Sequence, residues 1–350
     1  MNGEAVAATT PRVSIATSGS RWDAYVDAHP GASVYHGWAW RRVFEDAFQH
    51  ECVYLVAERE GRVCGVLPLV SMRTLLFGRL VVSLPFFNYG GVVADDEVAA
   101  GALLAESRQV AEQRKARHVE IRHIARRFAS LPCKSHKVAM TLALPGTADA
   151  MWKAVDNKVR NQVRKAEKSG LVAHAGGPEL IDEFYEVFAR NMRDLGTPVY
   201  GVGLFDETFR AAGDAARVYV VRQGERCLAA GITVAHRDGV ENPWASSLRE
   251  ARPLCANMLL YWHMLRDSIA RGLRVFDFGR STPDESTYRF KQQWGAQPTP
   301  LHWEYVLLGG SELPDHGPRS AKYQRAVELW QHLPLWLANA AGPGIVRGIP

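Results

Sequence analysis

The sequence lacks the features that place a chain in a membrane or outside the cell. Its best apolar runs, Val63–Val70 and Leu80–Phe87, cover less than half of the roughly 20 residues that a membrane-spanning helix needs, and each contains a proline. The N-terminus carries Glu4 and no basic start followed by an apolar stretch, so we expect no secretory signal. The five cysteines are scattered without pair spacing, which is typical of reduced, cytosolic thiols.

Motifs of several enzyme classes are also missing. There is no HxxxH, HExxH or CxxC, so the sequence does not predict a metal site. There is no GxSxG elbow of the common serine hydrolases, no GxGxxG of dinucleotide-binding proteins and no GxxxxGK[ST] phosphate loop. We therefore expect neither a metal nor a permanently bound cofactor.

What the chain does contain is an ordinary globular composition. Of its 350 residues, 47% are hydrophobic and 23% are charged. Because domains of about 100–200 residues are usual, this length predicts two domains and leaves room for a tail. The net charge of +5 is mild, so it is compatible with an anionic ligand but does not require nucleic acid.

Helices and strands alternate along both halves of the chain. The expected helices are 22–28, 38–48, 97–115, 148–169, 179–195, 256–271 and 285–294. The expected strands are 52–58, 62–70, 80–84, 118–122, 137–144, 217–222, 226–236, 241–247, 274–278 and 301–308.

The two halves also resemble each other in their residues. Val53–Val56 begins a hairpin in the first half and Val218–Val221 begins one in the second, and Val119–Arg122 corresponds to Phe276–Gly279. Two correspondences in the same order favour a duplicated domain, although any α/β protein shows some repetition of helix and strand. The predicted division is an N-terminal domain over 13–145, a similar C-terminal domain over 146–310 and an extension over 311–350.

A basic stripe runs along the expected helix 148–169. At about 100° per residue, its apolar residues share one arc, and a neighbouring arc contains Lys153, Arg160, Arg164 and Lys168. Arginine suits a phosphate because its planar fork binds two oxygens at once. Arg160 and Arg164 are therefore candidates for phosphate binding, and the alternative is a solvated basic helix face.

A second candidate region follows the expected strand 274–278. The loop after this strand contains Arg280, and the next helix contains Tyr288 and Lys291. Loops at the carboxyl ends of strands are the usual position of sites in α/β folds, so Lys291 and Arg280 could meet a negative group there. For Tyr288, a packing role and a chemical role are both open.

The loop 84–91 combines aromatic residues with the pair Gly90–Gly91. Glycine lets the backbone approach a ligand closely. Asn88 and Tyr89 are polar side chains in an otherwise apolar loop, so they are candidates for lining a cleft, and a structural turn is the alternative. Among the twelve histidines only His36 is a site candidate, against the alternative of a buried structural histidine.

Taken in order, these pieces resemble the FemAB-like branch of the GNAT acyltransferase superfamily, and within it the FemAB-like proteins of bacterial exosortase (PEP-CTERM) and exopolysaccharide systems. The matching segments, from about residue 13 to 308, are Tyr35–Trp40, Gly65–Leu69, Ser83–Phe86, Tyr89–Gly91, Arg160–Leu171, Phe276–Gly279 and Phe290–Ala296. The resemblance implies an α/β (α+β) fold of tandem, duplicated GNAT-like domains with mixed central sheets flanked by helices.

The resemblance also implies a chemistry. Characterised members of the family attach amino acids from aminoacyl-tRNA to a peptidoglycan precursor, and other relatives are thought to use acyl-CoA. Lys291 matches the family's lysine near the reacting ester and the precursor's phosphates, and Arg160 and Arg164 resemble a phosphate-contacting region. The Q/R-x-x-G-x-G/A loop of simple acetyltransferases is missing before the expected helix 256–271, which leaves the donor open.

We therefore expect an acyl- or aminoacyltransferase that acts on a phosphorylated cell-envelope, exopolysaccharide or peptidoglycan-type precursor, with acyl-CoA or aminoacyl-tRNA as co-substrate. The predicted catalytic residues are Lys291 and Tyr288. The predicted substrate-binding residues are Arg160, Arg164, Arg280, Asn88, Tyr89 and His36. The alternative is a non-catalytic binding module for a phosphorylated glycan or lipid-linked precursor.

The expected location is the cytosol, including the inner face of the membrane. The tail contains an apolar patch made of Trp330, Leu333, Leu335, Trp336 and Leu337. This patch either packs against the body of the protein or touches the membrane surface where precursors reside. The oligomeric state is not predicted.

Overall fold

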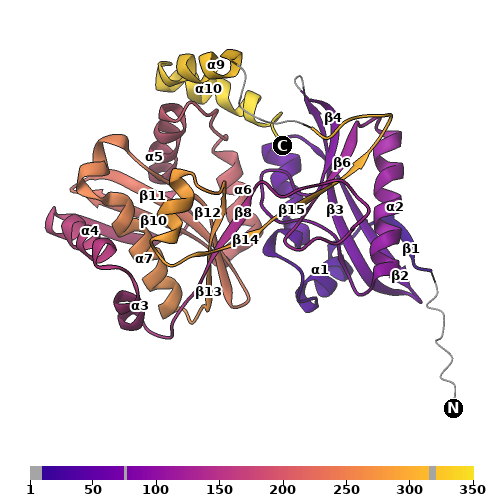
Figure 1. The fold of residues 1–350 in the computed structure, drawn as a ribbon, viewed down its shortest axis with the longest axis horizontal. Helices are drawn as coiled ribbons and strands as arrows, with labels where there is room; N and C mark the ends of the chain where they lie inside the picture. The colour runs from indigo at the N-terminus through magenta and orange to yellow at the C-terminus, as the bar shows by residue number, and fades with distance from the viewer. Residues whose placement is uncertain (1–9, 75–76, 315–320) are drawn as a thin grey trace.

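The computed structural model describes residues 10–74, 77–314 and 321–350, and it shows two mixed sheets that are each flanked by helices (Figure 1). In spatial order, the first sheet contains β1 (Arg12–Ile15), β2 (Glu51–Arg59), β3 (Arg62–Thr74), β4 (Gly78–Val82), β6 (His118–His123), β15 (His302–Leu307) and β7 (Cys133–Lys134), with β5 (Val93–Ala94) on β3. The second contains β9 (Leu171–Gly176), β10 (Ala216–Gln223), β11 (Arg226–His236), β12 (Gly239–Ser247), β13 (Val275–Ser281), β8 (Val138–Ala143) and β14 (Gln297–Pro300).

The two sheets repeat one topology. In each, an antiparallel run of four strands is followed by a parallel pair, which is β4 with β6 in the first sheet and β12 with β13 in the second. An antiparallel strand then follows on the far side of the pair, β15 in the first sheet and β8 in the second. The predicted fold class, a mixed α/β fold with central sheets flanked by helices, is confirmed.

Each sheet is completed by a strand from the other half of the chain. The strand β8 precedes residue 145 but pairs with β13, and β15 lies near residue 305 but pairs with β6 (Figure 1). The chain therefore crosses between the sheets in both directions. The division into domains at residue 145 stays a prediction, and the strands of the two sheets do not follow it.

The helices of the first half are α1 (Gly19–Ala28) and α2 (Glu97–Gln113). Those that follow are α3 (Ala148–Ala154), α4 (Asn157–Lys168), α5 (Ile181–Asp194), α6 (Gly203–Ala212), α7 (Ala256–Ala270), α8 (Ser286–Gln292), α9 (Ala321–Gln331) and α10 (Leu335–Val346). Most agree with the expected helices. The sequence analysis does not predict α6, α9 or α10. In α6 the first residue, Gly203, and the nearby Gly201 weaken the helical pattern.

Two expected helices are broken in the structure. The segment 38–48 forms a 3-10 turn, Trp38–Trp40, followed by a π-helical turn, Val43–Ala47. The expected helix 148–169 divides into α3 and α4 because Val155 is extended and buries its side chain in the core. The Arg160 guanidinium stabilises this break, since it donates to the carbonyl oxygens of Trp152 and Val155.

A single cluster of buried apolar side chains runs through both sheets. Phe87 shows how the halves join: its ring stacks on Tyr35 of the first half at 4.2 Å and meets Trp244 of the second half edge-on at 6.1 Å. The loop that contains Phe87 is therefore fixed between the two sheets. None of the helices within the described residues is long and apolar enough to cross a membrane.

Candidate functional site

The parallel strands β12 and β13 separate after a short paired stretch. Their register ends at the pair Glu241 and Asp277, which lie directly opposite each other. On its other side β13 pairs with β8 over its whole length, with an irregularity between Asp277 and Arg280. The divergence leaves a pocket of about 310 Å³, whose lining includes Glu241, Arg280 and Lys291.

The loop 84–91 of the first half reaches into this opening. The Asn88 side-chain amide donates to Glu241 Oε1 at 2.7 Å, and the Tyr89 hydroxyl donates to Asp277 Oδ2 at 2.5 Å. Glu241 and Asp277 are thus each hydrogen-bonded to one residue of the loop 84–91. The glycines of that loop serve internal packing, because a side chain at Gly91 would collide with the ring of His123.

The two acids share one buried environment. Burial and, after it, the neighbouring Asp277 carboxyl raise the pKa of Glu241 to about 8. Burial also raises the pKa of Asp277, although its hydrogen bond from Tyr89 opposes the change. Two carboxyl groups this close do not both ionise readily, so the pair retains a proton near neutral pH.

Lys291 on α8 supplies the positive charge that faces this pair. Its ammonium donates to the carbonyl oxygens of Gly279 at 3.1 Å and Arg280 at 2.9 Å, and its side chain is buried. Burial lowers the pKa of Lys291 to about 8, against the opposing effect of Asp277 and Glu241. Glu241 and Lys291 therefore both change charge close to neutral pH, where an acid–base group is most useful.

Arg280 brings a second cation to the same pocket. Its guanidinium carbon lies 5.6 Å from the ring centre of Trp303, and Arg122 approaches the same ring at 4.3 Å. Burial and Arg122 lower the pKa of Arg280. Among the described residues its Nη1 atom is buried without a hydrogen-bond partner, which suits an anionic group of a ligand.

The first sheet has an acid at the equivalent position, but its surroundings differ. Glu120 on β6 ends the parallel register with β4, as Asp277 ends the register of β13 with β12. Arg122 Nε donates to Glu120 Oε1 at 2.8 Å, and the Tyr305 hydroxyl donates to Oε2 at 3.0 Å. Burial alone would raise the pKa of Glu120, but these partners lower it overall. The proton-accepting chemistry is therefore available only at the second of these two equivalent positions.

His36 and Tyr89 line a different pocket, of about 480 Å³, in the first half. The His36 Nδ1 atom accepts from the backbone of Ser33, so Nε2 carries the proton that is donated to the Gly91 carbonyl oxygen at 2.9 Å. Burial lowers the pKa of His36 to about 4. A neutral imidazole with both nitrogens engaged positions the loop 84–91 and has no free group for substrate in this state.

The remaining predicted residues lie outside the pocket of Glu241 and Lys291. Tyr288 is half-buried against the hydrophobic core and is not among the residues that line this pocket. Arg160 is engaged by backbone carbonyls at the α3–α4 break, and Arg164 stacks on Trp152 at 5.5 Å. Their predicted roles stay predictions, but the structure does not bring them together with Lys291.

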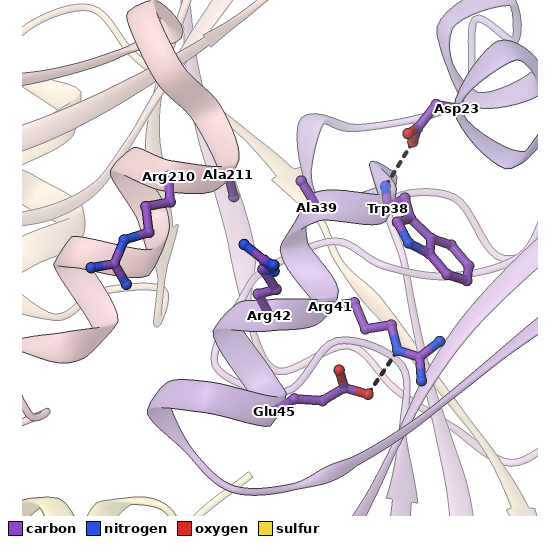
Figure 2. Close-up of a pocket in the computed structure, with 8 residues that line it drawn as sticks. All are labelled: Asp23, Trp38, Ala39, Arg41, Arg42, Glu45, Arg210 and Ala211. Carbon is purple, nitrogen blue, oxygen red and sulfur yellow. Dashed lines mark hydrogen bonds and ion pairs between the residues drawn. The ribbon is translucent and has the colours of Figure 1, made fainter. Parts of the chain in front are cut away.

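Another hollow, of about 520 Å³, lies between the segment 38–45 and α6 (Figure 2). Figure 2 shows Arg42 and Arg210 on opposite sides of this hollow, with Arg41 turned toward Glu45. Asp23 accepts from the backbone of Trp38 at 2.7 Å, and Glu45 pairs with Arg41 at 2.7 Å. Both acids are therefore already occupied, and we place the candidate active site at Glu241, Asp277 and Lys291.

Sequence reasoning missed the two acids of the site. Asp277 lies in the segment Phe276–Gly279, which was noted only as part of the repeat and of the resemblance, and Glu241 lies in an expected strand. A single acid between apolar residues of a buried strand, as in Phe276-Asp277-Phe278, is the pattern that could have found Asp277. No local pattern indicates that Glu241 lies opposite it.

Residues 153–292 match the family model described as acetyltransferase (GNAT) domain. Among solved structures, the chain is similar to FemX, with a TM-score of 0.66, 15% identity and coverage of 84% of this chain and 97% of that one. No curated protein matches the chain in sequence.

Two further solved structures are lysylphosphatidylglycerol synthetases. The C-terminal domain of the putative enzyme from Agrobacterium fabrum has a TM-score of 0.57 at 12% identity and covers 94% of this chain and 97% of its own. The enzyme from Bacillus licheniformis has a TM-score of 0.53 at 10% identity, with 90% and 96% covered. At these identities the likeness concerns the fold.

Residues 153–292 are therefore similar to a GNAT acetyltransferase domain, and the chain as a whole shares the fold of FemX. The matched region includes Glu241, Asp277 and Lys291. This likeness supports acyl or aminoacyl transfer in general, and it leaves the donor and the acceptor to be proposed.

Proposed function

We propose that this protein transfers an acyl or aminoacyl group from acyl-CoA or aminoacyl-tRNA to an amine of a phosphorylated cell-envelope precursor, of peptidoglycan or exopolysaccharide type. The observation that carries the proposal is the buried pair Glu241 and Asp277 facing Lys291 where β12 and β13 separate. The name lysylphosphatidylglycerol synthetase, which two structures of similar fold carry, indicates aminoacyl transfer to a phosphorylated lipid and supports a phosphorylated acceptor.

In the proposed reaction the acceptor amine attacks the donor's carbonyl carbon. A carbon–nitrogen bond forms, and the carbon–oxygen bond of an ester or the carbon–sulfur bond of a thioester breaks. The proton lost by the amine passes to the ionised member of the acid pair, and the leaving hydroxyl or thiol takes up a proton. Lys291 stabilises the oxyanion that develops on the carbonyl.

Arg280 would hold the phosphate of the donor or of the precursor in the same pocket. Its buried Nη1 atom lacks a partner among the described residues, and its guanidinium lies 5.6 Å from the ring centre of Trp303. Asn88 and Tyr89 orient the two acids from the first half. We place the reaction at the cytosolic face of the membrane, and exosortase-linked export remains part of the proposal.

The test is transfer of a radiolabelled group, offered separately as acyl-CoA and as aminoacyl-tRNA, to a mixture of envelope precursors. We expect a labelled product, and we expect Lys291→Ala to lower its rate at least a hundredfold because an oxyanion contact is lost. Lys165→Ala, an exposed lysine on α4, is the matched control. Unchanged turnover in Lys291→Ala would remove Lys291 from the mechanism, and binding without product would favour a non-catalytic module.

A further inference from the structure

The helix α10 exposes an apolar face to solvent. Its sequence, LWLANAAGPGIV, contains no charged residue. Trp336 is 71% exposed, and Leu337 and Ile345 are also exposed. At about 100° per residue these three side chains and the small residues between them lie on one half of the helix, opposite the buried side. A surface helix normally places polar residues on that half.

The opposite face of α10 is packed, so the exposed face belongs to a folded element. Its buried residues are Ala338, Gly342 and Val346. A side chain at Gly342 would collide with the backbone of Val199. The ends of the tail are also fixed: Arg193 donates to the Leu333 carbonyl oxygen at 2.9 Å, and His50 Nε2 donates to the Arg347 carbonyl oxygen at 2.8 Å.

The apolar exposure continues beyond α10. Leu329 on α9 is 72% exposed, and Leu195 and Val202, which flank the segment under the tail, are exposed as well. Among the described side chains of 324–350, the exposed charged residues are two arginines, Arg325 and Arg347, and one acid, Glu328, so this surface carries a net positive charge. Tryptophan and aliphatic side chains bordered by arginine are suited to an anionic bilayer surface.

We propose that the outer face of α10, with Leu329 of α9, docks on the surface of an anionic lipid bilayer. The helix would lie in the interface, since no described helix can span a bilayer. Figure 1 places α9 and α10 over α5, at the side of the molecule where the two halves meet. The packed side of α10 lies close to the pocket of Glu241, because Tyr200 lines that pocket and its neighbours Val199 and Gly201 lie against α10. The exposed Leu195 also lines this pocket.

The proposal deepens the proposed function, on which its biological meaning rests: a lipid-linked, phosphorylated acceptor would reach the pocket from the bilayer. Vesicle binding itself requires neither donor nor acceptor. Loss of vesicle binding would therefore overturn the docking surface alone, whereas failure of transfer in solution would overturn the proposed function alone.

The experiment is co-sedimentation of the full chain with vesicles of equal amounts of phosphatidylglycerol and phosphatidylcholine, and with pure phosphatidylcholine vesicles. We expect binding to the anionic vesicles that weakens with salt. The double variant Trp336→Glu and Ile345→Glu should lower the apparent affinity at least tenfold, because it removes apolar burial and adds like charge. Both side chains are exposed, so the fold should be unaffected.

The matched control is Val172→Glu, which makes the same kind of change at an exposed position of β9, remote in sequence from the tail. It should bind like the unaltered protein. Equal binding of the double variant and the unaltered protein would overturn the proposal. A dimer that the double variant abolishes, without vesicle binding, would also overturn it and would show that a second copy covers the face.

Discussion

At the scale of single residues, one neighbour decides whether a buried carboxyl can take up a proton. Glu120 and Asp277 end equivalent parallel strand pairs, yet Glu120 is paired with Arg122, whereas Asp277 faces a second acid, Glu241. An arginine fixes a carboxylate in its charged form, and a neighbouring acid disfavours that form. The two sheets thus offer similar backbone frames, and only in the second do the neighbouring side chains favour the protonated form of the carboxyl.

The pH dependence of transfer should show the titration of this site. The pKa of Glu241 is raised to about 8, so the proton-accepting form accumulates as pH rises toward 8. The pKa of Lys291 is lowered to about 8, so the positive charge is lost above it. We expect a bell-shaped profile of kcat/KM, which reports the free enzyme, with its maximum near pH 8, and Glu241→Gln should remove the rising limb. A rising limb retained in that variant would contradict the assignment.

Stability gives an independent measure of the same group. The pKa of Glu241 is higher in the folded protein than its ordinary value of 4.5, so folding retains a proton there. That contribution is complete below pH 4.5 and is lost as pH rises through about 8. Glu241→Gln should therefore raise Tm relative to the unaltered protein at pH 8 and leave the difference small at pH 4. Equal differences at the two pH values would show that Glu241 ionises normally.

Removing the hydroxyl of Tyr89 and that of Tyr288 in turn tests which of the two acts at the site. Tyr89→Phe removes the 2.5 Å hydrogen bond to Asp277, which further raises the pKa of that acid. We expect kcat to fall about tenfold, which is the usual effect of losing one hydrogen bond to a charged group. We also expect the rising limb of the pH profile to shift to higher pH. The matched change Tyr288→Phe should alter neither. A loss of turnover in Tyr288→Phe would restore its predicted catalytic role.

At the scale of elements, the exchanged strand β15 fixes the second half of the chain to the first through buried hydrogen bonds. The strand β15 brings Glu304 beneath the first sheet, where His123 donates from Nδ1 at 2.7 Å and the backbone amides of Arg127 and Phe128 donate as well. Val92 donates its backbone N–H to His123 Nε2 at 2.9 Å. Through His123, the strand β15 therefore anchors Val92, directly after the loop that contains Asn88 and Tyr89.

Removing the Glu304 carboxylate should destabilise the folded protein. Glu304→Ala leaves an imidazole and two amides without their acceptor in a fully buried place, so we expect the free energy of unfolding to fall by about 2–4 kcal/mol. Urea denaturation measures the change. Glu312→Ala, at an exposed position a few residues further on, should change it by less than about 0.5 kcal/mol. Similar changes in the free energy of unfolding for both variants would mean that the hydrogen bonds of Glu304 contribute little to stability.

At the scale of the whole molecule, the two halves share one hydrophobic core and exchange a strand each. Neither sheet can be completed without the other half of the chain. We expect a single cooperative thermal transition, in which the calorimetric and van't Hoff enthalpies agree. Two separable transitions would show that the halves fold independently in spite of the exchange.

The sequence by itself determined the local structure, because hydrophobic periodicity and turn residues act over short distances. It predicted most helices and strands, the mixed α/β class and the candidates Lys291, Arg280, Asn88 and Tyr89, of which the first three line one pocket. It did not predict the break at Val155, since an amphipathic pattern continues through it and only the core and Arg160 require the extended residue.

Only the tertiary structure decided which residues meet. Glu241 and Asp277 are far apart in sequence and become neighbours because two parallel strands end their pairing there. The exchange of β8 and β15 is equally invisible in the sequence, since either strand suits either sheet by its pattern. Local patterns fix periods and turns, whereas the partner of a strand and the charge beside a buried acid depend on contacts between distant segments.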